Sequence, residues 1–198
     1  MQISNAKEII LNHEAEWKRI MTDENDKQNL MRYGMMMITI AYIVLFVLSL
    51  IFRMGMGVFG GYSSMYVITS VVIRYVLSIA SLYFVPMILA ALAPSFGGKN
   101  DQMSALKLYV FAATPAWLGT SISAIPVIGW LVALAGGIYA IYLFWQHVAD
   151  AMTVPAEKKV GYVIVSVIVL AVIYWVIGLI GAGIAFSVSP YSLHAVGY

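Results

Sequence analysis

The chain has 198 residues, of which 62% are hydrophobic and only 10% carry a charge. Soluble domains are about half apolar and a quarter charged, so this composition excludes an ordinary globular domain and indicates an all-α polytopic membrane protein. The absence of cysteine excludes disulfides and thiolate metal sites. The net charge of +2 is too weak to indicate a nucleic-acid partner.

The N-terminal segment is polar: the first 32 residues contain five Lys/Arg and six Asp/Glu, without the apolar core of a signal peptide. Within it, Ile3–Met21 predicts an amphipathic helix, because at 100° per residue its apolar side chains fall in one arc. The arc consists of Ile3, Ala6, Ile9, Ile10, Trp17, Ile20 and Met21. Such a helix would lie on the membrane surface or pack on cytoplasmic loops, and its mixed charges favour the loops. We expect residues 1–31 to form this helix and a linker.

Long charge-free windows predict five membrane-spanning helices, because a helix needs about 20 residues to cross a bilayer. One window lies between Arg32 and Arg53. The 42 uncharged residues from Leu108 to Ala149 would form a single helix about 63 Å long, twice the roughly 30 Å of the hydrocarbon core, so this segment is expected to cross twice. The predicted spans are 33–52, 66–94, 104–124, 126–149 and 160–187, within a bundle of residues 32–187 that is followed by an external tail, 188–198.

Two prolines lie inside the long uncharged segment. Pro126 falls in "SAIPVIG", where it can start a helix after a turn, since the residue before a proline disfavours helical angles. Pro115 lies inside the third span, where a proline removes a backbone hydrogen bond. We expect a helix that begins near Ser104 and bends at Pro115; the alternative is a dedicated hinge.

The distribution of Lys and Arg predicts the orientation. With five spans, residues 1–32, 95–107 and 150–160 share one side and contain nine basic residues. The other side has only Arg53 and Arg74. The N-terminus is therefore expected in the cytoplasm and the C-terminus outside.

Four segments carry a family resemblance. "HEAEWKRI" (13–20), "FGGKNDQMSALKLYVFAATP" (96–115), "IPVIGWLVALAGGIYAIYLFW" (125–145) and "MTVPAEKKVGY" (152–162) together resemble the Yip family, the Ypt/Rab-interacting membrane proteins and their bacterial relatives. The family pattern has a Gly-Gly loop after the second span, here Gly97 and Gly98. It also has a proline in the third span, here Pro115, and a lysine before the fifth, here Lys158.

The resemblance implies five spans with a cytoplasmic N-terminus, and in eukaryotes an association with vesicle traffic and Rab GTPases. One departure lies at Gln146 and His147, where the family often has glycine. The lack of cysteine and the short tails favour a bacterial inner-membrane member.

Three polar side chains are candidate functional residues. Arg74 lies within the second span, where a charge is a functional candidate, although its long stem could also snorkel to the outer interface. Snorkelling is favoured, because the spans contain no Asp or Glu to pair with it. His147 and Asp150 share a helix face and could relay protons or hold an ion. Pairing with the nearby Lys158 and Lys159 at a helix end is the favoured interpretation.

Small residues spaced by four on the last two spans indicate close helix packing without a ligand. They are Gly129, Ala133, Gly137, Gly178 and Ala182. His13, His147 and His194 lie far apart in the sequence, which argues against a histidine metal site, and no catalytic motif is present. We therefore expect no enzyme activity, no metal and no cofactor.

Three functional hypotheses remain open at this stage. The favoured one is a non-enzymatic membrane scaffold that binds membrane or cytoplasmic proteins through its cytoplasmic face, as the resemblance implies. The second is a small transporter or channel that uses Arg74 or the His147/Asp150 pair. The third is a protein that binds membrane lipids between its spans. Each is compatible with an oligomer.

Overall fold

The computed structural model describes residues 4–22, 27–54 and 64–188, and these form helices joined by short turns, without a strand. The predicted tail after residue 188, and Ile3 of the predicted apolar arc, lie outside the described residues. In chain order the elements are α1 (Ser4–Leu11), α2 (His13–Thr22), α3 (Lys27–Ser49), η1 (Leu50–Met54), α4 (Ser64–Leu92), η3 (Ala93–Phe96), α5 (Gln102–Ser121), α6 (Ile128–Met152) and α7 (Ala156–Val188).

Four helices of the described chain are long and apolar enough to cross a membrane. They cover Lys27–Phe52, Met65–Phe96, Ile128–Met152 and Ala156–Ala185, which correspond to α3, α4, α6 and α7. Their outward faces carry large apolar side chains that are more than a third exposed, such as Ile43, Ile138 and Ile168. Because water would oppose such exposure, these faces belong against lipid. The chain is an integral membrane protein.

The remaining predicted span, 104–124, corresponds to α5, which differs from the other long helices in composition and in position. Residues 105–115 of α5 are all buried, and the helix packs against α3, α4 and α6. A helix surrounded by protein does not need an apolar surface toward lipid. This explains how α5 accommodates Lys107, Thr114 and Pro115 among its buried residues.

The pairing of α5 with α6 depends on residues without bulky side chains. A Cβ atom added to Gly136 would lie 2.6 Å from the Pro115 carbonyl oxygen, and one added to Gly119 would lie 3.0 Å from the Cα atom of Ala133. Pro115 thus lies at a backbone-to-backbone contact. Since its nitrogen carries no hydrogen, it also leaves the Phe111 carbonyl without its usual helical partner.

Of the predicted packing residues, Ala133 lies at these contacts, whereas the predicted glycines do not. Gly137 and Gly178 have nothing within 4 Å of an added Cβ atom. Gly129 approaches Ile122 and Ser123 in the turn before α6. The spacing of four was therefore assigned to the wrong glycine on α6, because the close contact falls at Gly136, one position earlier.

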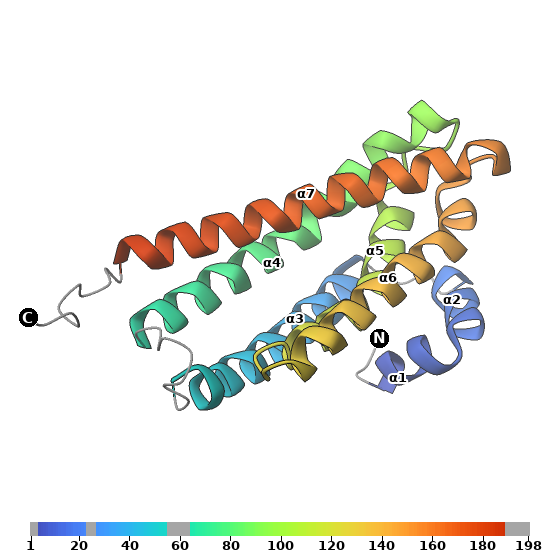
Figure 1. Cartoon of the computed structure of the whole chain (residues 1–198). Coiled ribbons are helices and arrows are strands. Elements are labelled where there is room, and N and C mark those ends of the chain that lie inside the picture. The colour runs from blue at the N-terminus through green and yellow to red at the C-terminus, as the bar shows by residue number, and fades with distance from the viewer. Residues whose placement is uncertain (1–3, 23–26, 55–63, 189–198) are drawn as a thin grey trace, which may run out of the picture.

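The N-terminal segment forms two helices where one was predicted, with the break at Asn12, a residue of low helix propensity. Ala6, Ile9, Trp17 and Ile20 of the predicted arc are buried, whereas Ile10 is exposed. The two helices pack against α5 and α6, and Figure 1 shows them beside the end of α6.

The two adjacent glycines of α6 provide a matched test of the packing. Gly136→Ala should destabilise the protein by about 1–3 kcal/mol, because the new methyl group meets the backbone of α5. Gly137→Ala should be neutral or slightly stabilising, since alanine has the higher helix propensity. Thermal unfolding of both variants in detergent measures the difference. Equal melting temperatures would contradict this contact.

Candidate functional site

The loop after η3 turns sharply at Gly97. This residue has φ of +78°, in the left-handed region that favours glycine. Its N–H donates to the Pro94 carbonyl at 3.0 Å, and the N–H of Gly98 donates to the Ala93 carbonyl at the same distance. These bonds satisfy carbonyl groups of η3 that have no partner in a following helical turn. The first glycine of the predicted loop motif is therefore required by backbone conformation.

The second glycine brings two loops together. A Cβ atom at Gly98 would lie 2.6 Å from the Met152 carbonyl oxygen and 2.8 Å from the Val154 side chain. The neighbouring Lys99 N–H donates to the same Met152 carbonyl at 3.0 Å. The loop 97–101 is thereby fixed against residues 152–155. We call the end of the bundle formed by α2 and these two loops the basic end.

Asp101 closes the loop and starts α5. Its carboxylate accepts hydrogen bonds from the backbone N–H of Met103 at 2.9 Å and of Ser104 at 3.2 Å, and from the Ser104 hydroxyl at 2.7 Å. Partial burial alone would raise the pKa of Asp101, but these bonds and the positive charge of Lys107 outweigh it and hold the pKa below its usual value. The carboxylate thus stays charged, and it supplies the acceptor oxygens that cap the N-terminus of α5.

Beside these loops, His147 of α6 lies in an aromatic cluster contributed by three helices. The side chain is buried, with 5% of its surface exposed. Its ring stacks on Trp17 of α2 with centroids 4.7 Å apart, and the ring of Phe111 of α5 meets it edge-on at 5.1 Å. Its Nε2 atom lies 3.3 Å from Nδ1 of His13. One of these two nitrogens must donate and the other accept, which requires at least one neutral imidazole.

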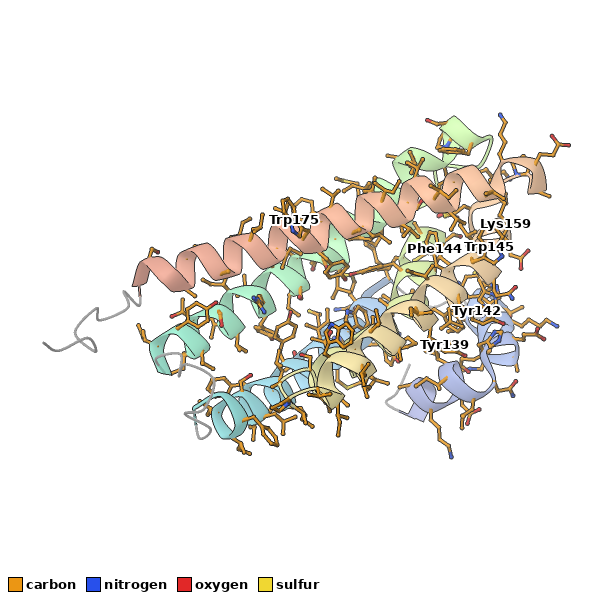
Figure 2. All side chains as sticks on the ribbon, viewed as in Figure 1. Tyr139, Tyr142, Phe144, Trp145, Lys159 and Trp175 are labelled. Carbon is orange, nitrogen blue, oxygen red and sulfur yellow. The ribbon has the colours of Figure 1, made fainter. Side chains whose placement is uncertain are left out.

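Further contacts extend this cluster along α6 toward α1. His13 meets Tyr142 edge-on at 5.7 Å, and Tyr142 stacks on Tyr139 at the same distance. The Tyr139 hydroxyl donates to the Ile10 carbonyl at 3.0 Å. Figure 2 shows both tyrosines on the side of α6 that faces the N-terminal helices. The two N-terminal helices are therefore attached to the bundle through rings and through hydrogen bonds.

Comparison with known protein families identifies the chain. The model of the Yip1 domain matches residues 7–180, which include both N-terminal helices and the bundle. The chain belongs to the Yip1 domain family. The resemblance predicted from the four sequence segments is confirmed. Neither a curated protein nor a solved structure matches the chain.

In this Yip1 domain, His147 and Asp150 lie in different surroundings. Asp150 is exposed one turn beyond the buried His147, whose ring contacts His13 and Trp17. Lys159 lies over the ring of Trp145, with Nζ 5.2 Å from the centroid. The sequence analysis did not predict these two partners of His147. The segment "HEAEWKRI" could have indicated them, because His13 and Trp17 are four residues apart and share one helix face.

The two facing histidines lack a third metal-ligating side chain among the described residues. In the part of the chain that the structure describes, no three His, Cys, Asp or Glu side chains gather closely enough to hold a metal ion. A structural or catalytic transition-metal site needs at least three protein ligands.

Arg74 of the Yip1 domain lies on the face of α4 that meets α7. A Cβ atom at Gly181 would lie 2.9 Å from Cγ of Arg74, so the arginine stem occupies the space that this glycine leaves. Its Nε atom is buried and has no hydrogen-bond partner among the described residues. Nearby on α4, Tyr75 and Ser78 pair with the hydroxyls of Thr39 and Tyr42 at 3.1 Å and 2.8 Å. Arg74 and His147 are thus separate sites.

The aromatic cluster predicts that the N-terminal helices depend on Trp17 for their attachment to the bundle. Trp17→Ala removes a buried ring that contacts both Phe111 and His147, a change that typically costs about 3–5 kcal/mol. We expect residues 4–22 to exchange backbone hydrogens much faster in this variant, as measured by mass spectrometry. Lys18→Ala, at an exposed neighbouring position, is the control and should leave the exchange unchanged. Equal protection in both variants would show that the cluster does not attach these helices.

Proposed function

We propose that this Yip1-domain protein is a non-enzymatic integral membrane scaffold that binds other proteins through its basic end. The family consists generally of non-enzymatic membrane proteins. The observation that carries the proposal is the construction of the basic end, where close backbone contacts join the loop 97–101 to residues 152–155, and α2 packs on α5 and α6 at the same end of the bundle. Lys99, Glu157 and Lys158 on this surface are exposed. A preformed surface of this kind limits the entropy lost on binding.

The proposal includes five membrane crossings. The antiparallel contacts of α5 and α6 extend from Gly119 and Ala133 to Phe111 and His147. Since α6 is long and apolar enough to cross, α5 would cross beside it. The 20 residues of α5 span about 30 Å, close to the thickness of the hydrocarbon core.

The same arrangement supports a cytoplasmic basic end. The backbone hydrogen bond between Lys99 and Met152 joins the two segments 95–107 and 150–160, which contain four of the lysines counted above. The N-terminal helices lie at the same end of the bundle. The Lys/Arg excess of these segments favours the cytoplasmic side. We propose a cytoplasmic N-terminus, an external C-terminus and location in a bacterial inner membrane.

Single cysteines in this cysteine-free chain test the crossing of α5. Val127→Cys should react with a membrane-impermeant maleimide in intact cells, because the turn between α5 and α6 would lie outside. Asn100→Cys should react only after permeabilisation, and so should Ala156→Cys, which shares its end of the bundle. Identical labelling of Asn100→Cys and Val127→Cys would show that α5 does not cross. Labelling of Asn100→Cys but not of Val127→Cys in intact cells would show that the orientation is opposite to the proposed one.

The transporter alternative has less support from the geometry. A cavity between α5, α6 and α7 is lined almost wholly by apolar side chains, and its lining does not include Arg74, His147 or Asp150. The stem of Arg74 packs on Gly181, and the His147 ring is covered by aromatic rings. These contacts favour structural roles for both side chains.

Crosslinking and flux measurements together decide between the two functions. A photo-crosslinking residue at Lys99 or Glu157 should form adducts with defined proteins in cells, while the same residue at the lipid-facing Ile43 should not. The double substitution Lys99→Glu/Lys158→Glu should reduce the adducts formed from Glu157 several-fold. Proton and ion flux through liposomes containing the protein should equal that of empty liposomes. A flux that the parent supports and Arg74→Gln abolishes would establish transport instead.

A further inference from the structure

A cavity of about 340 Å³ lies between the last three helices. It exists because α6 packs on α5 while α7 packs chiefly on α4, so α6 and α7 contact each other little along their lengths. Small side chains on all three helices widen it, and Gly137 has open space where a side chain would be. Its lining includes Ala113, Ala116, Gly137, Ala140, Ile141 and Ala171.

The cavity requires an apolar occupant. Its two tyrosines, Tyr109 and Tyr174, hydrogen-bond to each other through hydroxyls 2.6 Å apart, and Ser81 pairs with Tyr109 at 2.9 Å. The tyrosines therefore present mainly ring surface to the cavity. Ile141 both lines the cavity and is 46% exposed, so the opening faces the lipid side of α6. The surrounding medium there is hydrocarbon.

One end of the cavity is marked by groups that suit a phospholipid headgroup. Phe144, which lines the cavity, stacks on Tyr162 of α7 with centroids 6.5 Å apart and so joins the two helices there. The next residue, Trp145, lies under the ammonium group of Lys159. Figure 2 shows Phe144, Trp145 and Lys159 close together where α6 and α7 meet. Tryptophan prefers the membrane interface, and a lysine there attracts anionic lipids.

We propose that this cavity binds an acyl chain of an anionic phospholipid from the bilayer, with the lipid phosphate held by Lys159 beside Trp145. The size of the cavity favours a lipid chain over a helix of a second copy, because 340 Å³ holds no more than about one turn of a helix roughly 10 Å wide. This lipid site goes beyond the proposed scaffold function and does not depend on the identity of any protein partner.

Lipid retention after purification tests the acyl-chain part of the site. Ala140→Trp fills the cavity from α6, and Ile138→Trp places the same ring on the lipid-facing side of that helix, where Ile138 is 61% exposed. Native mass spectrometry in mild detergent should find phospholipid bound to the parent and to Ile138→Trp, and little on Ala140→Trp. Equal retention in the two tryptophan variants would overturn the proposal. So would a dimer of the parent that only Ala140→Trp dissociates, because the cavity would then be an interface between copies.

Rebinding to delipidated protein tests the headgroup part and remains decisive if Ala140→Trp fails to fold. Lys159→Gln should weaken binding of phosphatidylglycerol about fivefold, the effect of one interfacial lysine, and weaken binding of phosphatidylcholine less, because the choline cation offsets the charge of its phosphate. Lys99→Gln, which removes a charge from the neighbouring loop, should change neither. Equal affinity of the parent for both lipids would overturn the proposed preference for an anionic headgroup. Crosslinks from Glu157 should persist in Ala140→Trp, so failure of the lipid site and failure of the scaffold function are distinguishable.

Discussion

The close contact between α5 and α6 is the constraint on which the rest of the structure depends. Their backbones approach at Gly119 and Gly136, where even a methyl group would collide. In lipid, where the hydrophobic effect between helices is weak, such contact is a main source of association. Because α5 is surrounded by α3, α4 and α6, its position sets the positions of the others. The same pairing brings Phe111 and His147 together near the basic end.

This contact also explains why the two proposed sites lie apart from each other. At the basic end, α5 and α6 meet the N-terminal helices, and the aromatic cluster joins segments more than a hundred residues apart in sequence. Farther along, α6 follows α5 while α7 follows α4, and the two pairs separate (Figure 1). The separation leaves the apolar cavity open toward lipid. The same helix packing therefore produces both the basic end, which we propose binds proteins, and the cavity, which we propose binds a lipid chain.

Particular residues show where prediction from sequence succeeded and where it could not. The charge-free windows around α3, α4, α6 and α7 predicted helices that cross a membrane, and the ordered motifs around Gly97, Pro115 and Lys158 predicted the Yip1 domain. The spacing of four included Ala133, which lies at the contact with α5, but chose Gly137 where the adjacent Gly136 makes the close contact, because one residue along a helix turns the side chain by only about 100°. The partner of His147 was missed, because His13 is 134 residues away and periodicity carries no information on contacts between distant segments.

The sequence by itself determined the class of the protein, since composition and the length of apolar runs depend only on local residue content and bilayer thickness. It also determined the family, because motif order is a property of the chain alone. Only the tertiary structure decided which helix is central, which glycines touch and where a cavity remains. The physical reason is that all the long helices are apolar on nearly every face. Their packing therefore depends on the fit of small and large side chains between neighbours, which is settled only when the helices are assembled.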